Sequence, residues 1–202
     1  MTLTDANLEY GEFILLVLEA LEAADIPYLI GGAVAVWAWG EPRATRDLDL
    51  VVQISDSAVV KLSEELNKRN LLLPADIIQE RLNDNRGDVP LNAIHTLSGY
   101  KAEFYLLRDG GLFRAEAFKR RVLIDLGPDL GELYLHTPED LILYKLIYFS
   151  LSQQPKHIKD IAAIMLTLGN ELDTLYIQRW VDEKDLQTLW KSVQLQIQTK
   201  LR

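Results

Sequence analysis

The chain has 202 residues, of which 49% are hydrophobic, so it is long enough to bury a substantial core. Its formal net charge of −9 argues against a broad nucleic-acid-binding surface, although a local basic patch is compatible with it. The absence of cysteine excludes disulfides and thiolate zinc sites. Without a secretory signal or an apolar segment long enough to cross a bilayer, we expect a cytoplasmic protein with no membrane partner.

Residues 1–136 alternate between helical and strand patterns. Apolar positions at helical spacing predict a first helix over residues 5–24, which Thr4 or Asp5 would cap. The next part of the pattern predicts a strand at 28–30, a helix at 33–39, a strand carrying Asp47 and Asp49, and a helix at 55–69. A connector at 71–74, a short helix at 75–82 and a loop at 83–90 follow. The last part predicts strands at 91–97 and 101–107, a turn at 109–111, a helix at 112–118, and strands at 120–125 and 133–135.

From Thr137 onward the pattern is entirely helical. Thr137 followed by Pro138 and two acidic residues is a typical helix start, and that helix is expected to end near residue 151. A second helix is expected over 156–168, and one or two more over 173–201, which could also bind a partner. The predicted fold class is α+β: a mixed sheet flanked by helices in residues 1–136, packed against a helical subdomain in residues 137–202.

The stretch from Tyr28 to Val52 carries the clearest chemical pattern. A short apolar strand ends at Gly31–Gly32, a helix follows, and a second strand then carries Asp47 and Asp49. Residues two apart in a strand point to the same face, so the two carboxylates should stand side by side. They would repel each other unless a cation lay between them, and Mg²⁺ is the cation that best suits oxygen ligands and leaves room for phosphate.

These residues closely resemble the signature of the DNA polymerase beta-like nucleotidyltransferase superfamily. The spacing is most similar to that of the abortive-infection type IV toxin group and its small bacterial relatives, with the pattern Gly31–Gly32, a short helix and Arg43-x-Thr45-x-Asp47-x-Asp49. The resemblance implies transfer of a nucleoside monophosphate from an NTP to a hydroxyl on an RNA end such as tRNA, a protein or a small molecule, with release of pyrophosphate. It also implies a toxin-antitoxin role with an antitoxin protein as partner.

The resemblance implies a third carboxylate on a neighbouring strand, and Glu103 is the best candidate. Ala102 and Phe104 should point into the core, which leaves Glu103 on the polar face. Asp47, Asp49 and Glu103 would then bind two Mg²⁺ ions, or Mn²⁺ in their place. The family has aspartate more often at this third position.

The resemblance places Gly31, Gly32, Arg43 and Thr45 at the nucleotide. The glycines would let backbone amides approach the triphosphate, whereas the simpler alternative is a tight turn that needs glycine. Many relatives have serine after the first glycine; here backbone amides would make that contact alone. For Arg43, a salt bridge to Glu41 or Asp47 is the alternative to a phosphate contact.

A second resemblance to the toxin group lies in the helical half. It implies that Lys145 binds the nucleotide phosphates and that Asp160 acts at the edge of the site as a base or an orienting acid. The alternatives are a snorkelling lysine and surface ion pairs, including one between His157 and Asp160.

Other kinds of site find less support in the sequence. His95, His136 and His157 lack zinc-ligand spacing, and neither a phosphate-binding loop nor a nucleophile elbow is present. One of Trp37 and Trp39 should be core, and the other could stack on a base. The presence of Gly32 and Glu103 keeps a second functional class open, a catalytically inactive nucleotide-binding or protein-interaction module on the same fold.

Overall fold

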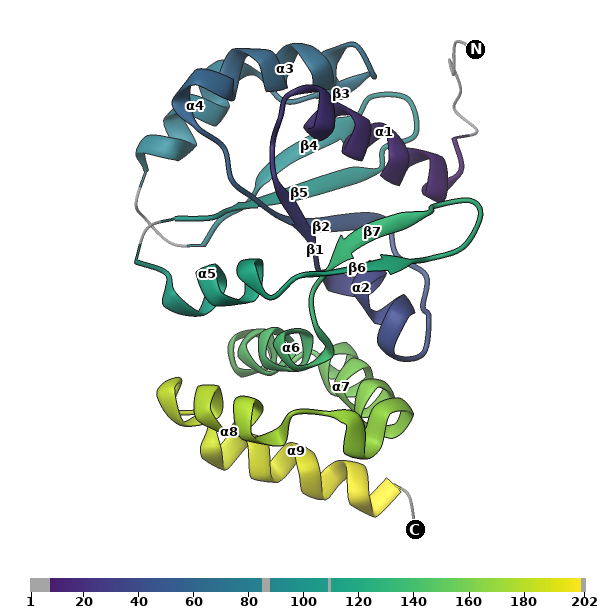
Figure 1. Ribbon diagram of the computed structural model, residues 1–202, viewed down its shortest axis with the longest axis vertical. Helices are drawn as coiled ribbons and strands as arrows, with labels where there is room; N and C mark the ends of the chain where they lie inside the picture. Colours follow the sequence, from purple (N-terminus) through teal and green to yellow (C-terminus); the bar gives the residue numbers. More distant parts are fainter. Residues whose placement is uncertain (1–7, 85–87, 109, 201–202) are drawn as a thin grey trace.

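The computed structural model describes residues 8–84, 88–108 and 110–200. Within these ranges, seven strands form one mixed sheet in the order β3-β4-β5-β2-β1-β7-β6 (Figure 1). β2 is parallel to β5 and β1 is parallel to β7, whereas the other neighbours are antiparallel. The predicted α+β class, with a mixed sheet flanked by helices, is confirmed. The strands are β1 Tyr28–Ile30, β2 Asp47–Val52, β3 Leu71–Leu72, β4 Leu91–His95, β5 Lys101–Leu106, β6 Val122–Asp125 and β7 Glu132–Leu135.

Helices cover the sheet and extend the molecule at one end. Figure 1 shows α1, α3 and α4 at one end of the molecule and the stacked helices α6 to α9 at the other. The α-helices are α1 Tyr10–Ala23, α2 Gly32–Trp39, α3 Val59–Asn67, α4 Ala75–Asn83, α5 Leu112–Lys119, α6 Pro138–Ser152, α7 Pro155–Leu168, α8 Thr174–Glu183 and α9 Gln187–Lys200, with 3-10 turns at Asp56–Ala58 and Gly169–Glu171. None of the helices that the structure describes combines the length and apolar character needed to span a membrane.

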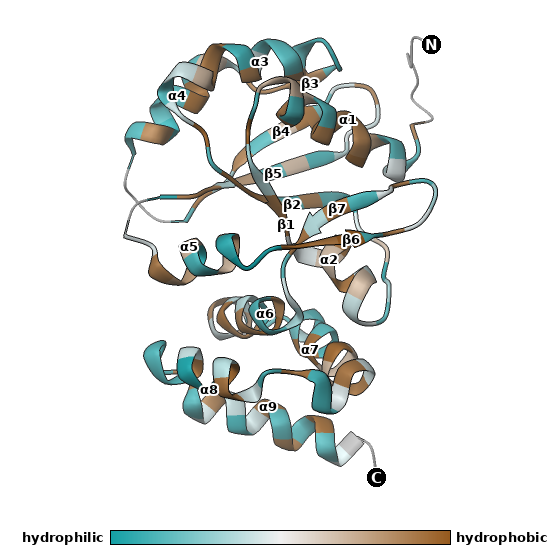
Figure 2. Cartoon of the chain, in the orientation of Figure 1, coloured by the Kyte–Doolittle hydropathy of each residue, from teal (hydrophilic) through white to brown (hydrophobic). Residues whose placement is uncertain are grey.

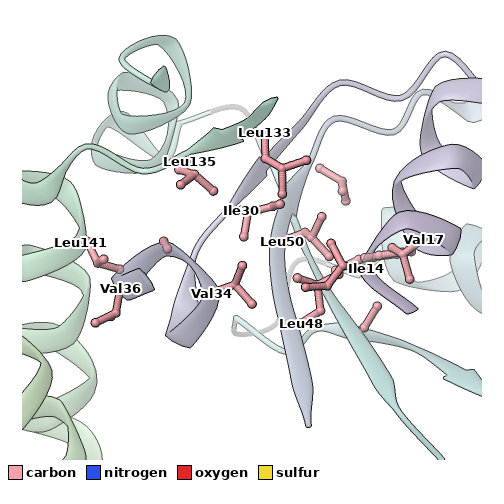
Figure 3. Close-up of a cluster of buried hydrophobic side chains, with 14 of the residues drawn as sticks. Ile14, Val17, Ile30, Val34, Val36, Leu48, Leu50, Leu133, Leu135 and Leu141 are labelled. Atoms are coloured by element: carbon pink, nitrogen blue, oxygen red, sulfur yellow. The ribbon is translucent and has the colours of Figure 1, made fainter. Parts of the chain in front are cut away.

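The hydrophobic core runs from α1 through the sheet to the helical half. The central strands β1 and β2 are among the hydrophobic segments in Figure 2. Leu48 and Leu50 of β2 point toward Ile14 of α1, and on the other side Val36 of α2 lies beside Leu141 of α6 (Figure 3). Because strand residues alternate, burying Leu48 and Leu50 turns their neighbours at positions 47 and 49 to the opposite face.

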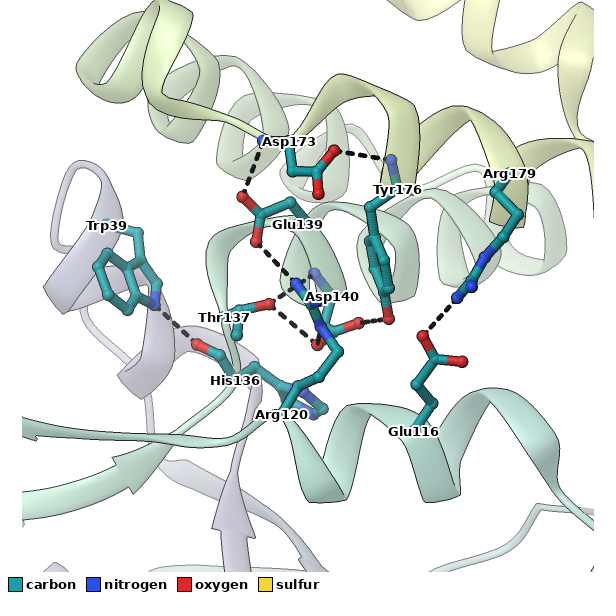
Figure 4. A network of polar contacts seen from close by, with 10 residues as sticks. All are labelled: Trp39, Glu116, Arg120, His136, Thr137, Glu139, Asp140, Asp173, Tyr176 and Arg179. Atoms are coloured by element: carbon teal, nitrogen blue, oxygen red, sulfur yellow. Dashed lines mark hydrogen bonds and ion pairs between the residues drawn. The ribbon is translucent and has the colours of Figure 1, made fainter.

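The helical half attaches to the sheet half through the start of α6. The Thr137 side chain caps this helix by accepting a hydrogen bond from the Asp140 amide, as predicted. The buried Asp140 carboxylate also accepts a hydrogen bond from the Tyr176 hydroxyl of α8 at 2.5 Å and pairs with the Arg120 Nε at 3.3 Å (Figure 4). The start of α6 therefore connects α5 and α8. Whether residues 1–136 and 137–202 form separate folding units stays a prediction.

Three predictions about local structure differ from the observed fold or cannot be compared with it. The first helix begins at Tyr10, where Glu9 and Glu12 form a capping box, and the proposed caps Thr4 and Asp5 lie outside the described residues. The predicted connector at 71–74 is wrong in part, because Leu71–Leu72 form the edge strand β3 beside β4. Parts of the loops predicted at 83–90 and 109–111 lie outside the described residues.

Candidate functional site

A cavity of about 680 Å³ lies between the polar face of β2 and β5, the start of α2, and helices α6 and α7. It brings together residues that are far apart in the sequence. Eight of the nine predicted site residues line it: Gly31, Gly32, Arg43, Thr45, Asp47, Asp49, Glu103 and Lys145. The ninth, Asp160, is buried and does not line the cavity, but it contacts the lining residues Arg43 and Lys145. The catalytic and binding roles of these residues stay predictions.

The register between β2 and β5 places the three carboxylates on one face. Asp49 lies opposite Glu103 and Asp47 lies opposite Lys101 on the parallel neighbouring strand. Directly paired strand positions bring their side chains close together on the same face. The sheet thus places the Asp49 and Glu103 carboxylates side by side, with Asp47 two residues away from Asp49.

Lys101 is a cation already present among these carboxylates. Its Nζ lies 2.5 Å from Glu103 Oε1 and 3.4 Å from Asp47 Oδ1. The other Glu103 oxygen, Oε2, accepts a hydrogen bond from the Tyr105 hydroxyl at 3.0 Å. In the described part of the chain, no three His, Asp or Glu side chains form a group that could hold a metal ion as they stand. A divalent ion at this edge would therefore have to displace the lysine ammonium.

Asp49 differs from the other two carboxylates, because no described residue forms an ion pair with it. Burial, together with the negative charges of Glu103 and Asp47, raises its pKa to about 6, although the Lys145 charge opposes this. Asp49 also packs against the glycine turn: a Cβ built on Gly32 would lie 1.7 Å from Asp49 Oδ2, and Gly32 has a φ of +57°. Both facts explain why the turn needs glycine at position 32.

The amides of the glycine turn differ in their availability to a ligand. The Gly31 N–H donates to the Asp49 carbonyl at 2.9 Å and belongs to the sheet, so it is not available to a phosphate. The amides in the first turn of α2, beginning at Gly32 and Ala33, have no partner within the helix, and these two residues line the cavity. The phosphate-binding role of the amides at the start of α2 stays a prediction.

Asp160 links the two basic residues that the sequence assigned to the phosphates. Arg43 binds it through two nitrogens, at 3.1 and 3.3 Å, and Lys145 Nζ lies 2.7 Å from Oδ2. Burial alone would raise the pKa of Asp160, but its two cationic partners outweigh burial and lower it. Burial lowers the pKa of Lys145, which has one anionic partner and Arg43 nearby.

This arrangement decides between the alternatives for these residues. Lys145 and Asp160 are both buried, so the alternatives of a snorkelling lysine and a surface ion pair are wrong. The alternative pair of Arg43 with Glu41 or Asp47 is also wrong, because Arg43 pairs with Asp160. A carboxylate held by two cations with a lowered pKa is a poor base. The geometry favours the orienting role for Asp160.

Thr45 and the two tryptophans support the backbone. The Thr45 hydroxyl donates to the Asp47 carbonyl at 3.0 Å, and the Tyr10 hydroxyl reaches the same carbonyl at 2.8 Å. Trp37 and Trp39 donate their indole N–H groups to the Arg43 and His136 carbonyls. Both tryptophans pack against the core, and neither lines the cavity, so the base-stacking alternative for them finds no support.

Sequence reasoning missed several residues that line the cavity, notably Arg114, His136, Tyr144 and Tyr148. Tyr144 and Tyr148 could have been found, because they lie within one helical turn of Lys145 and four residues apart. Arg114 and His136 come from α5 and from the segment before α6, and no sequence pattern connects them to Asp49.

Comparison with known proteins gives matches at the level of structure. No protein-family model matches the chain, and a search of curated proteins finds no match. The solution structure of the antibiotic-resistance factor ANT(2'')-Ia has a TM-score of 0.58 and 14% sequence identity, covering 90% of this chain and 96% of that chain. The crystal structure of ANT(2'')-Ia with adenylyl-2''-tobramycin has a TM-score of 0.53 and 16% identity, covering 80% and 90%.

A third similar structure, an antigenic nucleotidyltransferase-like protein from Paracoccidioides brasiliensis, has a TM-score of 0.48 and 17% identity, covering 75% of this chain and 74% of that chain. At the identities of the first two matches, the likeness concerns the fold alone. The chain therefore has the nucleotidyltransferase-type fold, a mixed sheet flanked by helices.

Proposed function

We propose that the protein is a metal-dependent nucleotidyltransferase, which transfers a nucleoside monophosphate from an NTP to an acceptor hydroxyl and releases pyrophosphate. The observation that carries this proposal is the pairing of Asp49 with Glu103 on parallel strands, beside Asp47 and the glycine turn, in a cavity that Lys145 also lines. The nucleotidyltransferase-type fold agrees with it.

The carboxylates fit a divalent ion by the chemistry of their donors. Carboxylate oxygens are the ligands that Mg²⁺ prefers, and Mn²⁺ accepts the same set. The Lys101 ammonium already lies between Asp47 and Glu103, and the attraction of these carboxylates for a positive charge supports the proposal. Bound there by Asp47, Asp49 and Glu103, two divalent ions would neutralise phosphate charge and lower the pKa of the acceptor hydroxyl.

The protein's own residues would position the triphosphate. Lys145 and Arg43, both held in place by Asp160, provide fixed positive charge on one wall. The amides at the start of α2 provide hydrogen-bond donors on the other. An acceptor hydroxyl directed at the α-phosphorus would form the new P–O bond as the bond to pyrophosphate breaks. Fixed donors that need no rearrangement favour such a step.

The charges around the cavity limit the acceptor. Five basic residues line it, against the three carboxylates that would hold metal: Arg43, Arg46, Arg114, Lys145 and Lys156. Arg46 and Lys156 are exposed, and no described acidic residue pairs with them. An RNA end or a neutral or anionic small molecule or protein segment suits this lining better than a polycation. Tobramycin, the moiety in the ANT(2'')-Ia complex, is therefore not expected to be an acceptor here.

The alternative function is an inactive nucleotide-binding or protein-interaction module. The contact of Lys101 with two of the three carboxylates favours it, because a lysine that stays in place would keep the metal out. The alternative predicts that the protein binds NTP without turnover under any metal condition.

The deciding experiment incubates the protein with α-labelled NTPs, Mg²⁺ or Mn²⁺ and a cell extract. We expect transfer of label to an acceptor, and we expect Asp49→Asn to lower it by about 100-fold or more, because transition-state charge loses its stabilisation. Asp129→Asn, an exposed aspartate away from the cavity, is the matched control and should retain full transfer.

NTP binding without any transfer by the wild-type protein would instead support the inactive module. The proposed toxin role uses the same pair of proteins: expression of the wild type, but not of Asp49→Asn, should stop growth unless an antitoxin is present. Identification of the labelled acceptor in the extract then names the substrate class.

A further inference from the structure

One wall of the cavity is a row of nearly parallel aromatic rings. Tyr144 and Tyr148 lie one turn apart on α6, with ring centroids 6.3 Å apart and planes inclined by 26°. His157 of α7 continues the row, 6.1 Å from Tyr148 and inclined by 25°. All three residues line the cavity that contains the carboxylates.

The row is anchored at one end and open at the other. The Tyr144 ring packs against Phe113 and His136, at 4.8 Å from each, and this partly buried ring contacts the hydrophobic core. Tyr148 is only partly buried and does not belong to the described hydrophobic core. Packing therefore does not explain why a large aromatic ring stands at position 148.

His157 provides an independent sign of a ligand. Its side chain is 9% exposed, and Nδ1 is buried without a hydrogen-bond partner among the described residues. Burial and the charges of Lys145 and Lys156 lower the pKa of His157 to about 4, so the ring is neutral at pH 7. Buried polar atoms nearly always have a partner, so the unpaired Nδ1 of a residue that lines the cavity leaves a hydrogen-bonding position that a bound group could fill.

The row lies at the right place relative to the phosphate-binding residues. Tyr148 follows Lys145 by three residues on α6, a rise of about 4.5 Å along the helix axis. Leu151 and Ser152 continue the lining along the same helix and are exposed. A nucleotide whose phosphates contact Lys145 would thus extend its base along α6, past Tyr148.

Resting on the proposed function, we propose that Tyr148 and His157 form the subsite for the base of the NTP. The planar heteroaromatic ring stacks on Tyr148, and a polar atom of the base pairs with His157 Nδ1. Every base has a π-face, so stacking selects for a base without strongly selecting which one. The subsite distinguishes a nucleotide from a bare polyphosphate.

The test compares the binding of a non-hydrolysable NTP analogue with that of inorganic tripolyphosphate, measured by calorimetry. We expect Tyr148→Leu to weaken analogue binding about ten-fold, in the range that loss of one base–aromatic stack produces, and to leave tripolyphosphate binding unchanged. Tyr148→Phe keeps the ring and should bind both ligands like the wild type. His157→Phe should weaken analogue binding alone. Tyr134→Leu, on β7 outside the cavity, is the matched control.

Equal affinity of Tyr148→Leu and the wild type for the analogue would overturn this assignment, and so would an equal loss for the analogue and tripolyphosphate. Unchanged tripolyphosphate binding also shows that the variant is folded. A different result would contradict the proposed function but not the base subsite. In that case the wild type would bind the analogue with the expected dependence on Tyr148 but would transfer no label to any acceptor.

Discussion

Lys101 determines the electrostatics of the three carboxylates at the level of single residues. Its ammonium contacts Asp47 and Glu103. The hydrogen bond to Glu103, together with the negative charges of both carboxylates, raises the pKa of Lys101 despite some desolvation. The lysine thus stays charged and compensates a cluster that would otherwise repel itself. Asp49 has no such partner among the described residues, so no ion pair compensates its charge.

Replacing this lysine should change the affinity for divalent ions. We expect Lys101→Met to bind Mn²⁺ about ten-fold more tightly, because the ion no longer competes with a cation that is about one-third exposed. Titration followed by electron paramagnetic resonance measures this without any turnover. Lys119→Met, an exposed lysine on α5, is the control, and unchanged or weaker Mn²⁺ binding in Lys101→Met would contradict the competition.

The sequence predicted the face on which Glu103 lies but not its partners. Alternation in a strand is a local property, so Lys101, Glu103 and Tyr105 could be assigned to one face from the pattern of their neighbours. The contact of Lys101 with Asp47 depends on the register between β2 and β5. That register joins residues more than fifty positions apart, and no local pattern specifies it.

At the level of elements, α6 carries two functions. One side presents Lys145 and Tyr148 to the cavity, while its first turn joins the helical half to the sheet half. The Thr137–Pro138 start was predictable, because capping is local. The partners of its first turn were not, since Arg120 and Tyr176 come from either side of it in the chain and meet only through packing.

Removing the carboxylate at the centre of this junction should destabilise the protein. We expect Asp140→Ala to lower the free energy of unfolding by about 3 kcal/mol, because the Tyr176 hydroxyl loses its acceptor, Arg120 loses its buried partner and Thr137 loses a hydrogen bond. Urea denaturation measures the loss.

Asp182→Ala is the matched control for this change. Asp182 is exposed and pairs only with Gln178 among the described residues, so its loss should cost no more than about 0.5 kcal/mol. Equal destabilisation by the two variants would show that the Asp140 junction is not a special contributor to stability.

For the whole molecule, the net charge does not describe the local charge of the cavity. The net charge of −9 suggested a surface unsuited to nucleic acid, yet the cavity collects five basic residues around its three carboxylates. Composition counts charges without placing them, and the basic residues reach the cavity from the segment before β2 and from α5, α6 and α7. A local basic site inside an acidic protein thus became visible only in the folded structure.

The same cavity makes the stability of the whole molecule depend on pH through His136. Burial, reinforced by the charges of Arg114 and Lys145, lowers its pKa to about 3 from an ordinary value of 6.5. Below pH 6.5 the unfolded chain therefore takes up a proton that the folded protein does not, and the free energy of unfolding falls as the pH falls. His157 acts in the same direction, whereas Asp49, with its pKa raised to about 6, binds a proton in the folded state and acts in the opposite one.

Replacing His136 should remove its part of this dependence. From pH 6.5 to pH 5, above the range in which most carboxylates titrate, His136 alone should cost about 1.5 kcal/mol of stability. We expect urea denaturation of His136→Gln to show a stability loss over this interval smaller than that of the wild type by this amount, whatever its absolute stability. Parallel pH profiles for the two proteins would contradict this prediction. They would mean that His136 is protonated in the folded state or that its ring leaves the buried position. Either would require the cavity to be more open to water than the contacts of His136 with Gly31 and Tyr144 indicate.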